Sequence, residues 1–476
     1  MASGGRPNCL GRWPLIELVP VLAILAILTR ELLWLTACGI FLSSLDDIAV
    51  DLLWLGGFAF RRERPLPPLP PEPGRFALIV PAWDESAVIG AMVGRLCQTI
   101  QNPRLRIFVG VYPNDPATLA AVQAVGDDRV QAVITSRAGP TTKADCLNHL
   151  WRGVLAHEAR TGQRFKAVVL HDAEDVVDPA SLDLYDRCIP ALAMVQVPVL
   201  PIQDPETRWV SGHYCDEFAQ AHAKDMMVRG LLGAPVPSAG VGTAIERDVL
   251  ARLAGPGNAP FDAASLTEDY EMGTRVHRLG LKGRMVRAHV GGRLVATRAY
   301  FPATIDTAVR QKSRWLTGIA LSGWDRLGWD GGLATRWMLA RDRKGLFTAA
   351  IAMLGYAVAV LVLLQLALRA WVSARAGVPL PPLIVDAHSI LPGFLMLNAV
   401  LLGWRLVMRA GFTGAAYGWR EGLFAMPRAV LANAINFLAA IKAVTRYRQA
   451  LGSGAPPEWG KTEHRFPDAG VETANG

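Results

Sequence analysis

Two long apolar segments in the second half of the chain place the strongest constraint on its fold. Leu346–Leu368 contains no charged residue, and Ile390–Met408 contains only Arg405, near its C-terminal end. Each segment is long enough to cross a bilayer as a helix, and an arginine near a helix end can reach the headgroups. Buried core helices could have the same composition, but two such segments close together favour the membrane. We therefore expect a transmembrane helix pair within residues 334–410.

The N-terminal region, residues 1–60, is apolar with a charged interruption. Leu15–Leu28 and Leu32–Leu45 are separated by a short stretch that contains Arg30 and Glu31. A signal peptide fits poorly, because no small-residue cleavage site is followed by a polar segment. We predict a tight membrane hairpin with these two charged residues at its turn.

Charge and cysteine content indicate the surroundings of the chain. The net charge is +8, and basic residues cluster beside the apolar segments, for example at Arg61, Arg62 and Arg64. This pattern is typical of contact with anionic membrane lipids, and no nucleic-acid motif accompanies it. The six cysteines include no CxxC pair, so they indicate neither a disulfide framework nor a zinc site. We expect membrane lipids as partners, no nucleic acid, and a soluble part on a reduced cytosolic face.

A proline-rich segment, residues 61–74, precedes a globular region. Its six prolines favour a stiff, extended linker. The following residues, 75–333, alternate between strand-like and helix-like segments. The strand-like ones are Phe76–Val80, Arg106–Tyr112, Val130–Ile134 and Lys166–His171, and Ala144–Arg160 is helix-like. This alternation predicts an α/β domain with a mainly parallel mixed sheet, helices on both faces, and a ligand site beyond the carboxyl ends of the strands.

The last region, residues 411–476, contains an apolar segment with polar interruptions. Phe424–Val444 includes Arg428, Asn436 and Lys442. One more crossing would put the C-terminus opposite the globular region. We prefer an interfacial helix in the plane of the membrane, which keeps the C-terminal tail on the cytosolic side.

Closely spaced acids follow the fourth strand-like segment. Asp172, Glu174 and Asp175 offer carboxylate oxygens, which Mg²⁺ and Mn²⁺ prefer, and a bound cation could neutralise a leaving diphosphate. The alternative is an acidic turn before a helix capped by Asp178. Lys143 opens a helix and could contact phosphate oxygens, although its segment alone favours a solvated surface lysine.

A second pair of acids, Glu268 and Asp269, follows Thr267. A positioned carboxylate can remove the proton from an attacking hydroxyl, so this pair could hold a general base. The alternative is structural: Ser265 and Glu268 have capping-box spacing, and acids in the first turn suit the helix dipole. Taken alone, the pattern favours the cap.

Gln311, Arg314 and Trp315 lie at i, i+3 and i+4, so they share one face of a helix. Arginine can pair with a diphosphate, and tryptophan can stack on a sugar ring. A basic, aromatic helix resting on lipid headgroups is supported equally well, because Arg310 and Lys312 lie in the same segment.

The order of these motifs resembles the membrane-embedded family 2 glycosyltransferases, whose familiar members are the cellulose and hyaluronan synthases. The motifs are Pro81–Glu85, Asp115, Asp172–Glu174, Thr267–Asp269 and Gln311–Trp315. Val111–Asp115, His171–Asp175 and Gln311–Ile319 are similar to the phage-receptor (NfrB) type of inner-membrane glycosyltransferase. The resemblance extends from Leu15 to Pro467, which is nearly the whole chain.

The resemblance implies a GT-A-type catalytic domain on the cytosolic side of a bacterial-type inner membrane. It further implies inverting transfer from a nucleotide-diphosphate sugar, of which a UDP-sugar fits best, with Mg²⁺ or Mn²⁺ as cofactor. Asp172 and Glu174 match the motif that holds the cation and the diphosphate, and Asp269 matches the general base, with Glu268 beside it. The usual Asp-x-Asp is Asp-x-Glu here, so either Glu174 or Asp175 could be the second ligand.

The other matched positions concern the substrates. Glu85 and Asp115 match donor-nucleotide positions, and Lys143 could add a phosphate contact. The motif with Gln311, Arg314 and Trp315 matches the one that holds the donor and the polymer end. Thr462 and His464 resemble a C-terminal gating segment.

Our hypothesis is a metal-dependent, inverting membrane glycosyltransferase of the hexosyltransferase type that extends an exported polysaccharide. The predicted membrane helices are few for a polymer channel, so either a dimer or an envelope export partner would complete the path, or the product would be short. One alternative is the transfer of a single sugar to a lipid or protein acceptor. An alternative of another class is a non-catalytic inner-membrane scaffold for a receptor or for secretion.

Overall fold

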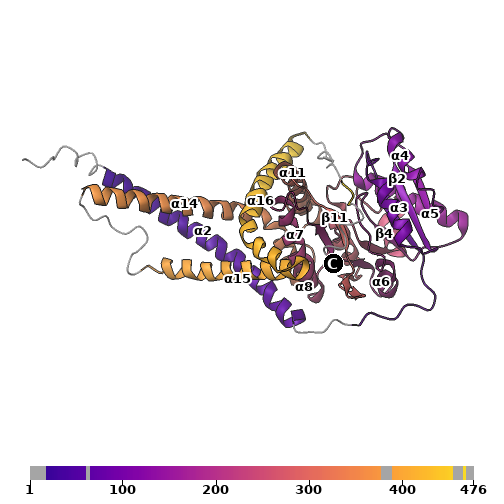
Figure 1. Cartoon of the computed structure of the whole chain (residues 1–476), viewed down its shortest axis with the longest axis horizontal. Coiled ribbons are helices and arrows are strands. Elements are labelled where there is room, and N and C mark those ends of the chain that lie inside the picture. Colours follow the sequence, from indigo (N-terminus) through magenta and orange to yellow (C-terminus); the bar gives the residue numbers. More distant parts are fainter. Residues whose placement is uncertain (1–17, 60–64, 377–388, 454–464, 468–476) are drawn as a thin grey trace, which may run out of the picture. The chain divides into compact units, whose positions relative to one another are not determined.

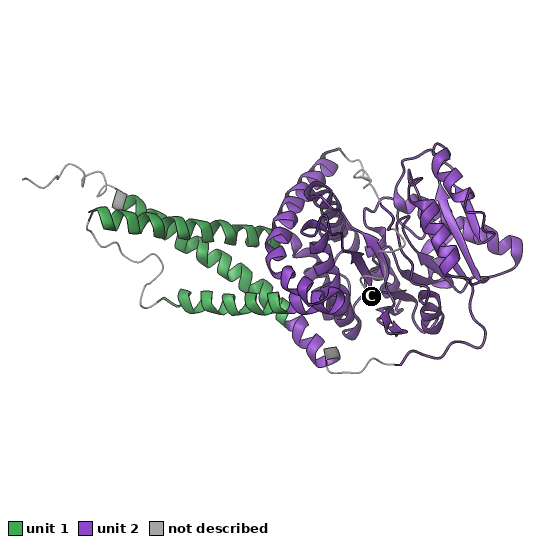
Figure 2. Ribbon diagram, in the orientation of Figure 1, with its two compact units in different colours: residues 1–48, 346–407 green, residues 49–345, 408–476 purple. Residues whose placement is uncertain are grey.

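The structure is a computed structural model that describes residues 18–59, 65–376, 389–453 and 465–467 (Figure 1). Thr462 and His464 lie outside the described residues. The chain divides into two compact units (Figure 2), one of residues 1–48 and 346–407 and one of residues 49–345 and 408–476.

The first unit consists of most of three long helices: α2 (Leu18–Trp54), α14 (Gly345–Ala376) and α15 (Leu391–Tyr417). The strands of the second unit are β1 (Phe76–Pro81), β2 (Leu105–Val111), β3 (Val130–Ile134), β4 (Ala167–Leu170), β5 (Met194–Gln196), β6 (Val199–Ile202), β7 (Thr243–Glu246), β8 (Gly283–Met285), β9 (His289–Val290), β10 (Arg293–Leu294) and β11 (Thr297–Tyr300). Its helices are η2 (Leu55–Ala59), α3 (Ile89–Thr99), α4 (Pro116–Gln123), α5 (Lys143–Thr161), α6 (Ser181–Cys188), α7 (Val210–Gln220), η3 (Ala221–Asp225), α8 (Met226–Leu231), α9 (Arg247–Ala254), η4 (Gly255–Gly257), α10 (Glu268–Arg278), α11 (Ile305–Leu316), η5 (Thr317–Ser322), α12 (Gly323–Leu327), α13 (Leu333–Arg343) and α16 (Trp419–Ser453).

The N-terminal hairpin predicted from the sequence is wrong, because α2 is one continuous helix. Arg30 and Glu31 do not break it: both are strong helix formers, and their exposed side chains pair with each other at 3.3 Å. The hydroxyl of Thr29 donates to the carbonyl of Leu25 at 2.7 Å, so no polar group there needs a turn. A charged interruption without glycine or proline therefore stays helical.

Four helices in the described part of the chain are long and apolar enough to cross a membrane. The spans are Pro20–Gly57, Gly345–Arg375, Leu391–Tyr417 and Trp419–Gly452. In the first unit, Gln365 donates to the Leu25 carbonyl at 3.3 Å, and Arg405 pairs with Asp47 at 3.1 Å. These contacts join α2 to α14 and α15, so polar groups in the apolar helices face one another.

The second unit contains a seven-stranded mixed sheet in the order β3-β2-β1-β4-β7-β5-β8. The four strands predicted from the sequence are confirmed as β1, β2, β3 and β4, which pair in parallel. β7 runs antiparallel to both β4 and β5. β6 and β11 form a separate parallel pair.

The sheet is covered on both faces because the side chains of its strands alternate between two cores. Leu78 and Val80 of β1 pack with α3, whereas Ala77 and Ile79 pack with α5 and α9. All four side chains are fully buried, as expected of a central parallel strand with helices on both sides. The α/β fold with a mainly parallel mixed sheet is thus confirmed, and the labelled strands and helices can be followed in Figure 1.

The described part of the proline-rich segment lies along the second unit. Arg187 donates to the carbonyl of Pro67 at 2.8 Å, and the amide of Gly74 donates to Asp186 at 3.0 Å. Leu66 packs against the core. The second unit also continues beyond the predicted boundary at residue 333, since it includes α13 and extends to residue 345.

Candidate active site

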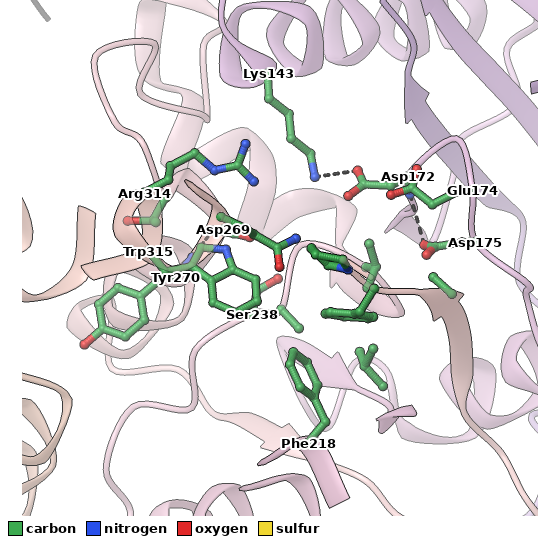
Figure 3. A pocket seen from close by; sticks show the side chains of 18 of the residues that line it. Lys143, Asp172, Glu174, Asp175, Phe218, Ser238, Asp269, Tyr270, Arg314 and Trp315 are labelled. Carbon is green, nitrogen blue, oxygen red and sulfur yellow. Dashed lines mark hydrogen bonds and ion pairs between the residues drawn. The ribbon is translucent and has the colours of Figure 1, made fainter. Parts of the chain in front are cut away.

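A cavity of about 700 Å³ lies beyond the carboxyl end of β4 (Figure 3). Its walls come from the starts of α5 and α10, the inner face of α11, and the α7–η3–α8 segment. Nine of the residues singled out in the sequence line it: Lys143, Asp172, Glu174, Asp175, Glu268, Asp269, Gln311, Arg314 and Trp315. The fold therefore brings together three motifs that are far apart in the chain.

The acids after β4 have separate roles. Asp172 forms an ion pair with Lys143 in the cavity (Figure 3). Asp175 is buried, and its Oδ2 accepts from the amide of Asp172 at 3.0 Å and contacts Nδ1 of His171 at 2.8 Å. Through these contacts, Asp175 stabilises the loop that carries Asp172 and Glu174. The side chain of Asp178 does cap the turn before α6, because its Oδ1 accepts from the amide of Ala180 at 3.0 Å, but α6 itself begins later, at Ser181.

Lys143 is held inside the site and is not a solvated surface lysine. It opens α5, whose N-cap Thr142 accepts from the amide of Asp145 at 3.2 Å. Burial by itself lowers the pKa of Lys143, but Asp172, Glu268 and Asp269 outweigh burial and raise that pKa. The ammonium therefore stays charged where an anionic substrate group would enter.

Glu268 and Asp269 begin α10 at the cavity. The predicted capping box is absent, because Thr267 is the N-cap and makes no side-chain bond, while Ser265 donates to Glu271 at 2.7 Å. Burial and the neighbouring Asp269 raise the pKa of Glu268 to about 7. Burial also raises the pKa of Asp269, although Lys143 opposes this shift. A carboxylate with a raised pKa is a stronger base, which suits proton abstraction.

A glycine loop that the sequence analysis overlooked forms the back wall beside Asp269. Gly240 has φ +77°, and a Cβ added there would lie 2.5 Å from Oδ2 of Asp269. The loop is fixed by buried Gln196, whose Oε1 accepts from the amide of Ala239 at 2.8 Å. The repeated glycine in Gly240-Val241-Gly242 was the available sequence signal, because such residues often allow close backbone approach.

α11 presents the third motif to the cavity. Thr304 and Thr307 form a capping box at its start. Gln311, Arg314 and Trp315 line the cavity, as their shared helical face predicted. Lys312 points to the other side, where it pairs with Glu217 and donates to Asn436 at 3.0 Å. For these three cavity residues the cavity-facing interpretation holds, rather than contact with lipid.

Aromatic side chains that sequence analysis missed extend the site beyond Trp315. Phe218 and Phe301 lie with ring centroids 4.8 Å apart, and Phe218 lies 6.3 Å from Trp315. All three line the cavity. Their pattern was not distinguishable from ordinary core residues, because a lone phenylalanine in a helix is most often a packing residue.

Glu85 and Asp115 are not among the residues that line this cavity. Asp115 caps α4 by accepting from the amide of Thr118 at 3.2 Å, and it also accepts from the amide of Asp84 at 2.6 Å. The amide of Glu85 donates to the hydroxyl of Thr118 at 3.0 Å. The carboxylate of Asp115 therefore joins the loops after β1 and β2, whereas Glu85 contributes its backbone amide, and the contact of either acid with a nucleotide stays a prediction.

The C-terminal segment returns to the cavity at Arg465. This residue lines the cavity, and its guanidinium lies 5.3 Å from the ring centroid of Tyr300. Phe466 packs against the core of the sheet. The cationic side chain of Arg465 thus lies in the cavity wall next to Tyr300 of β11.

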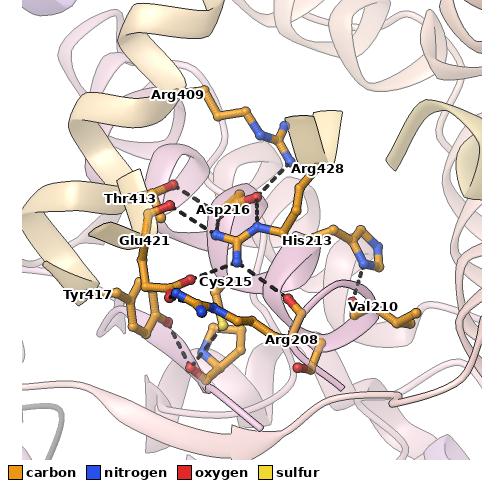
Figure 4. Close-up of polar contacts among 12 residues, drawn as sticks. Arg208, Val210, His213, Cys215, Asp216, Arg409, Thr413, Tyr417, Glu421 and Arg428 are labelled. Carbon is orange, nitrogen blue, oxygen red and sulfur yellow. Dashed lines mark hydrogen bonds and ion pairs between the residues drawn. The ribbon is translucent and has the colours of Figure 1, made fainter. Parts of the chain in front are cut away.

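A buried ionic cluster fixes the helix that carries Phe218 (Figure 4). Arg428 of α16 contacts both oxygens of Asp216 in α7, at 2.7 and 3.0 Å, and Oε2 of Glu421 at 2.7 Å. Thr413 and Arg409 add contacts to Asp216 at 3.2 and 3.5 Å. Asp216 is fully buried and Arg428 is 1% exposed. α16 thus packs on α7 and α11; its placement in the plane of the membrane stays a prediction.

The donor groups of the site fit a hard divalent cation. No group of three or more His, Cys, Asp or Glu side chains in the described parts of the chain could hold a metal ion without other ligands. Asp172 and Glu174 nevertheless offer carboxylates on one cavity wall. Mg²⁺ is usually bound by one or two carboxylates together with substrate phosphates and water. The cation would therefore be held jointly with a diphosphate.

The mixed sheet, the acids beyond β4 and the carboxylate pair at α10 define a GT-A-like glycosyltransferase fold. The chain belongs to glycosyltransferase family 2: residues 73–318 match the family described as "Glycosyltransferase like family 2". The family resemblance seen in the sequence is confirmed.

Two curated relatives are similar to nearly the whole chain. They are the bacteriophage adsorption protein B of Escherichia coli (strain K12) and the bacteriophage N4 adsorption protein B of Escherichia coli O157:H7. Each is 35% identical over 465 residues, which cover 91% of this chain and 62% of the relative. The chain thus spans less than two thirds of the length of these relatives.

The fold is also similar to a solved structure of a mannosyltransferase. PcManGT from Pyrobaculum calidifontis, in complex with GDP-Man and Mn²⁺, superposes with a TM-score of 0.54 at 15% identity. The superposition covers 87% of this chain and 99% of PcManGT. This similarity shows that the fold extends beyond the sheet to the flanking helices.

Proposed function

We propose that this protein is an inverting membrane glycosyltransferase that moves a sugar from a nucleotide-diphosphate donor, a UDP-sugar, to an exported polysaccharide. The observation that carries the proposal is the cavity in which Asp269 lies with Asp172, Lys143 and Arg314. The cavity offers charged groups for a diphosphate, and it offers a base that lies near an aromatic surface. That combination serves sugar transfer and has no evident use in a purely structural protein.

The donor end of the cavity is assigned to the charged side chains. Asp172 and Glu174 would hold Mg²⁺ or Mn²⁺, which when bound neutralises charge on the leaving diphosphate. Mn²⁺ and GDP-Man in the related PcManGT structure support this assignment. Lys143 and Arg314 offer cationic donors for the remaining phosphate oxygens. Glu85 and Asp115 are proposed to contact the donor nucleotide.

The chemical step follows from the position of Asp269. An acceptor hydroxyl attacks the anomeric carbon of the donor sugar, and the bond from that carbon to the diphosphate oxygen breaks. Asp269 takes the hydroxyl proton, and the electron pair leaves with the nucleoside diphosphate. A single displacement of this kind inverts the anomeric configuration. Trp315 offers an indole face for the acceptor sugar. Glu268 lies beside Asp269 in the chain, and the charge of Asp269 helps to raise the pKa of Glu268.

We place the protein in a bacterial-type inner membrane with the second unit in the cytosol. The four candidate membrane helices in the described parts of the chain support a membrane location. An envelope export partner would carry the product outward, and Thr462 and His464 would belong to a gating segment. Because the relatives are named as bacteriophage adsorption proteins, a phage-receptor scaffold is the second candidate function.

The decisive experiment is nucleotide release by the detergent-purified full chain with a panel of UDP-sugars. We expect release with one sugar in Mn²⁺ or Mg²⁺, no release after EDTA treatment, and recovery when the cation is added back. Asp269→Asn should lower the rate by about 10²–10⁴-fold while UDP still binds, because it removes the base and keeps the shape. No release with any donor, together with intact UDP binding, would support the scaffold function instead.

A further inference from the structure

One histidine in the cavity wall has no part in the reaction described above. His222 lies in η3, a π-helical segment between α7 and α8. It lines the cavity and is 4% exposed. Short π segments are rare and are found frequently at functional sites, because the extra residue changes which side chain faces a ligand. The segment therefore presents a buried polar ring to the cavity.

The protonation of this ring follows from one contact. The amide of Val199 donates to Nδ1 of His222 at 2.9 Å. An amide nitrogen can only donate, so Nδ1 carries no hydrogen and the ring hydrogen must lie on Nε2. Burial, with a smaller contribution from the positive charge of Arg287, lowers the pKa of His222 to about 3, so the ring stays neutral. The contact with Val199 is the one hydrogen bond that His222 makes within the described residues.

The contacts of the ring place it at the aromatic end of the cavity. His222 lies edge-on to Phe218, with ring centroids 5.1 Å apart and an interplanar angle of 65°. Phe218 in turn contacts Phe301 and Trp315. Val199, which fixes Nδ1, begins β6 and is paired with Thr297 of β11. The ring is thus held between a strand and an aromatic cluster.

We propose that His222 is a specificity-determining residue that donates its Nε2 hydrogen to an oxygen of the acceptor sugar. A neutral donor suits a hydroxyl or ring oxygen, whereas a diphosphate is better served by Lys143 and Arg314. The hydrogen bond would fix the rotation of a sugar that stacks on Trp315, since stacking alone allows the ring to turn about its normal. This inference rests on the proposed glycosyl transfer and names one acceptor contact within it.

Two substitutions separate the two nitrogens of the ring. His222→Asn places an amide oxygen near the position of Nδ1, so it can still accept from Val199, but it has no donor near Nε2. His222→Gln places an amide nitrogen near Nε2 and loses the partner of Val199. A purely structural role predicts that the asparagine variant is the milder of the two. A role in binding the acceptor predicts the reverse.

The test uses membranes that contain the full-length chain and its own acceptor, with the radiolabelled UDP-sugar that the wild type turns over. The measured quantity is the ratio of sugar incorporated into product to UDP released, because water replaces a poorly bound acceptor. We expect His222→Asn to lower this ratio about five- to tenfold, and His222→Gln to stay within twofold of the wild type. Thermal unfolding of both variants reports the structural effect separately.

The outcomes are distinguishable from failure of the proposed function. If the wild type releases no UDP from any donor, the glycosyl transfer and this inference both fail. If the wild type transfers sugar and His222→Asn keeps its ratio, the inference alone is overturned. Equal losses in both variants would also overturn it, because they would report damage to the wall rather than loss of one donor.

Discussion

The glycine beside the proposed base provides a sharp test of the site, because one methyl group should separate catalysis from folding. In Gly240→Ala, the new Cβ would lie 2.5 Å from Oδ2 of Asp269 and 3.3 Å from its Cβ. Ordinary contact begins near 3.5 Å, so the carboxylate would have to move by about 1 Å. The backbone cannot relax freely, since Gln196 holds the loop through the amide of Ala239.

Two effects of different size are expected from this change. A side chain at φ +77° costs about 1–2 kcal/mol of stability, because a left-handed backbone crowds Cβ against the carbonyl. A displacement of about 1 Å at a reacting group can cost about 10²-fold in rate. Gly233→Ala is the matched control: Gly233 has φ +67°, and nothing lies within 4 Å of its added Cβ.

The assay compares UDP release and thermal unfolding for both variants and the wild type. We expect similar losses of stability in the two variants and a loss of about 10²-fold in turnover only in Gly240→Ala. Turnover of Gly240→Ala within threefold of Gly233→Ala would refute the assignment of Asp269 as a closely packed base.

Three further predictions concern stability, pH and the metal. Arg428→Met should cost about 3–5 kcal/mol in thermal unfolding, because Asp216 loses its bidentate partner in the interior, and a loss below about 1 kcal/mol would contradict this. Burial raises the pKa of Asp269, and this residue must be deprotonated to act as a base. kcat/KM should therefore fall as the pH is lowered through a value above about 4, the ordinary pKa of an aspartate. A fall that occurs only at or below about pH 4 would contradict this prediction. Glu174→Gln should raise the Mn²⁺ concentration needed for half-maximal UDP release more than Asp175→Asn does, since an oxygen of Asp175 is already bonded within its loop, and the opposite order would make Asp175 the ligand.

The four parallel strands β1 to β4 could be predicted closely, whereas β5, β7 and β8 of the same sheet and the continuous N-terminal helix could not. The predicted strand Val130–Ile134 has the same bounds as β3 in the structure, and the predicted helix Ala144–Arg160 differs from α5 by one residue at each end. The first segment is mainly apolar and the second has apolar residues at helical spacing, so local pattern and tertiary structure agree. The hairpin failed because Arg30 and Glu31 were interpreted as a turn, although neither residue type disfavours a helix.

The candidate site shows the same division at the level of single residues. The pattern of Ser265 and Glu268 matched a helix cap, but in the fold Ser265 is engaged by Glu271 and Glu268 faces the cavity. Local spacing states which contacts a turn could make, and tertiary contacts decide which of them form. Asp175 likewise differs from Glu174 in its contact with His171, which the spacing of the motif did not reveal.

The sequence by itself determined the apolar segments, the four parallel strands β1 to β4 and the three motifs, because hydrophobic period and residue chemistry are local properties. Only the tertiary structure decided that Lys143 pairs with Asp172, that Gly240 lies against Asp269, and that a π turn aims His222 at the aromatic end of the cavity. These contacts join residues that are distant in the chain, and their distances depend on how the helices pack on the sheet. No spacing in a single sequence encodes that packing.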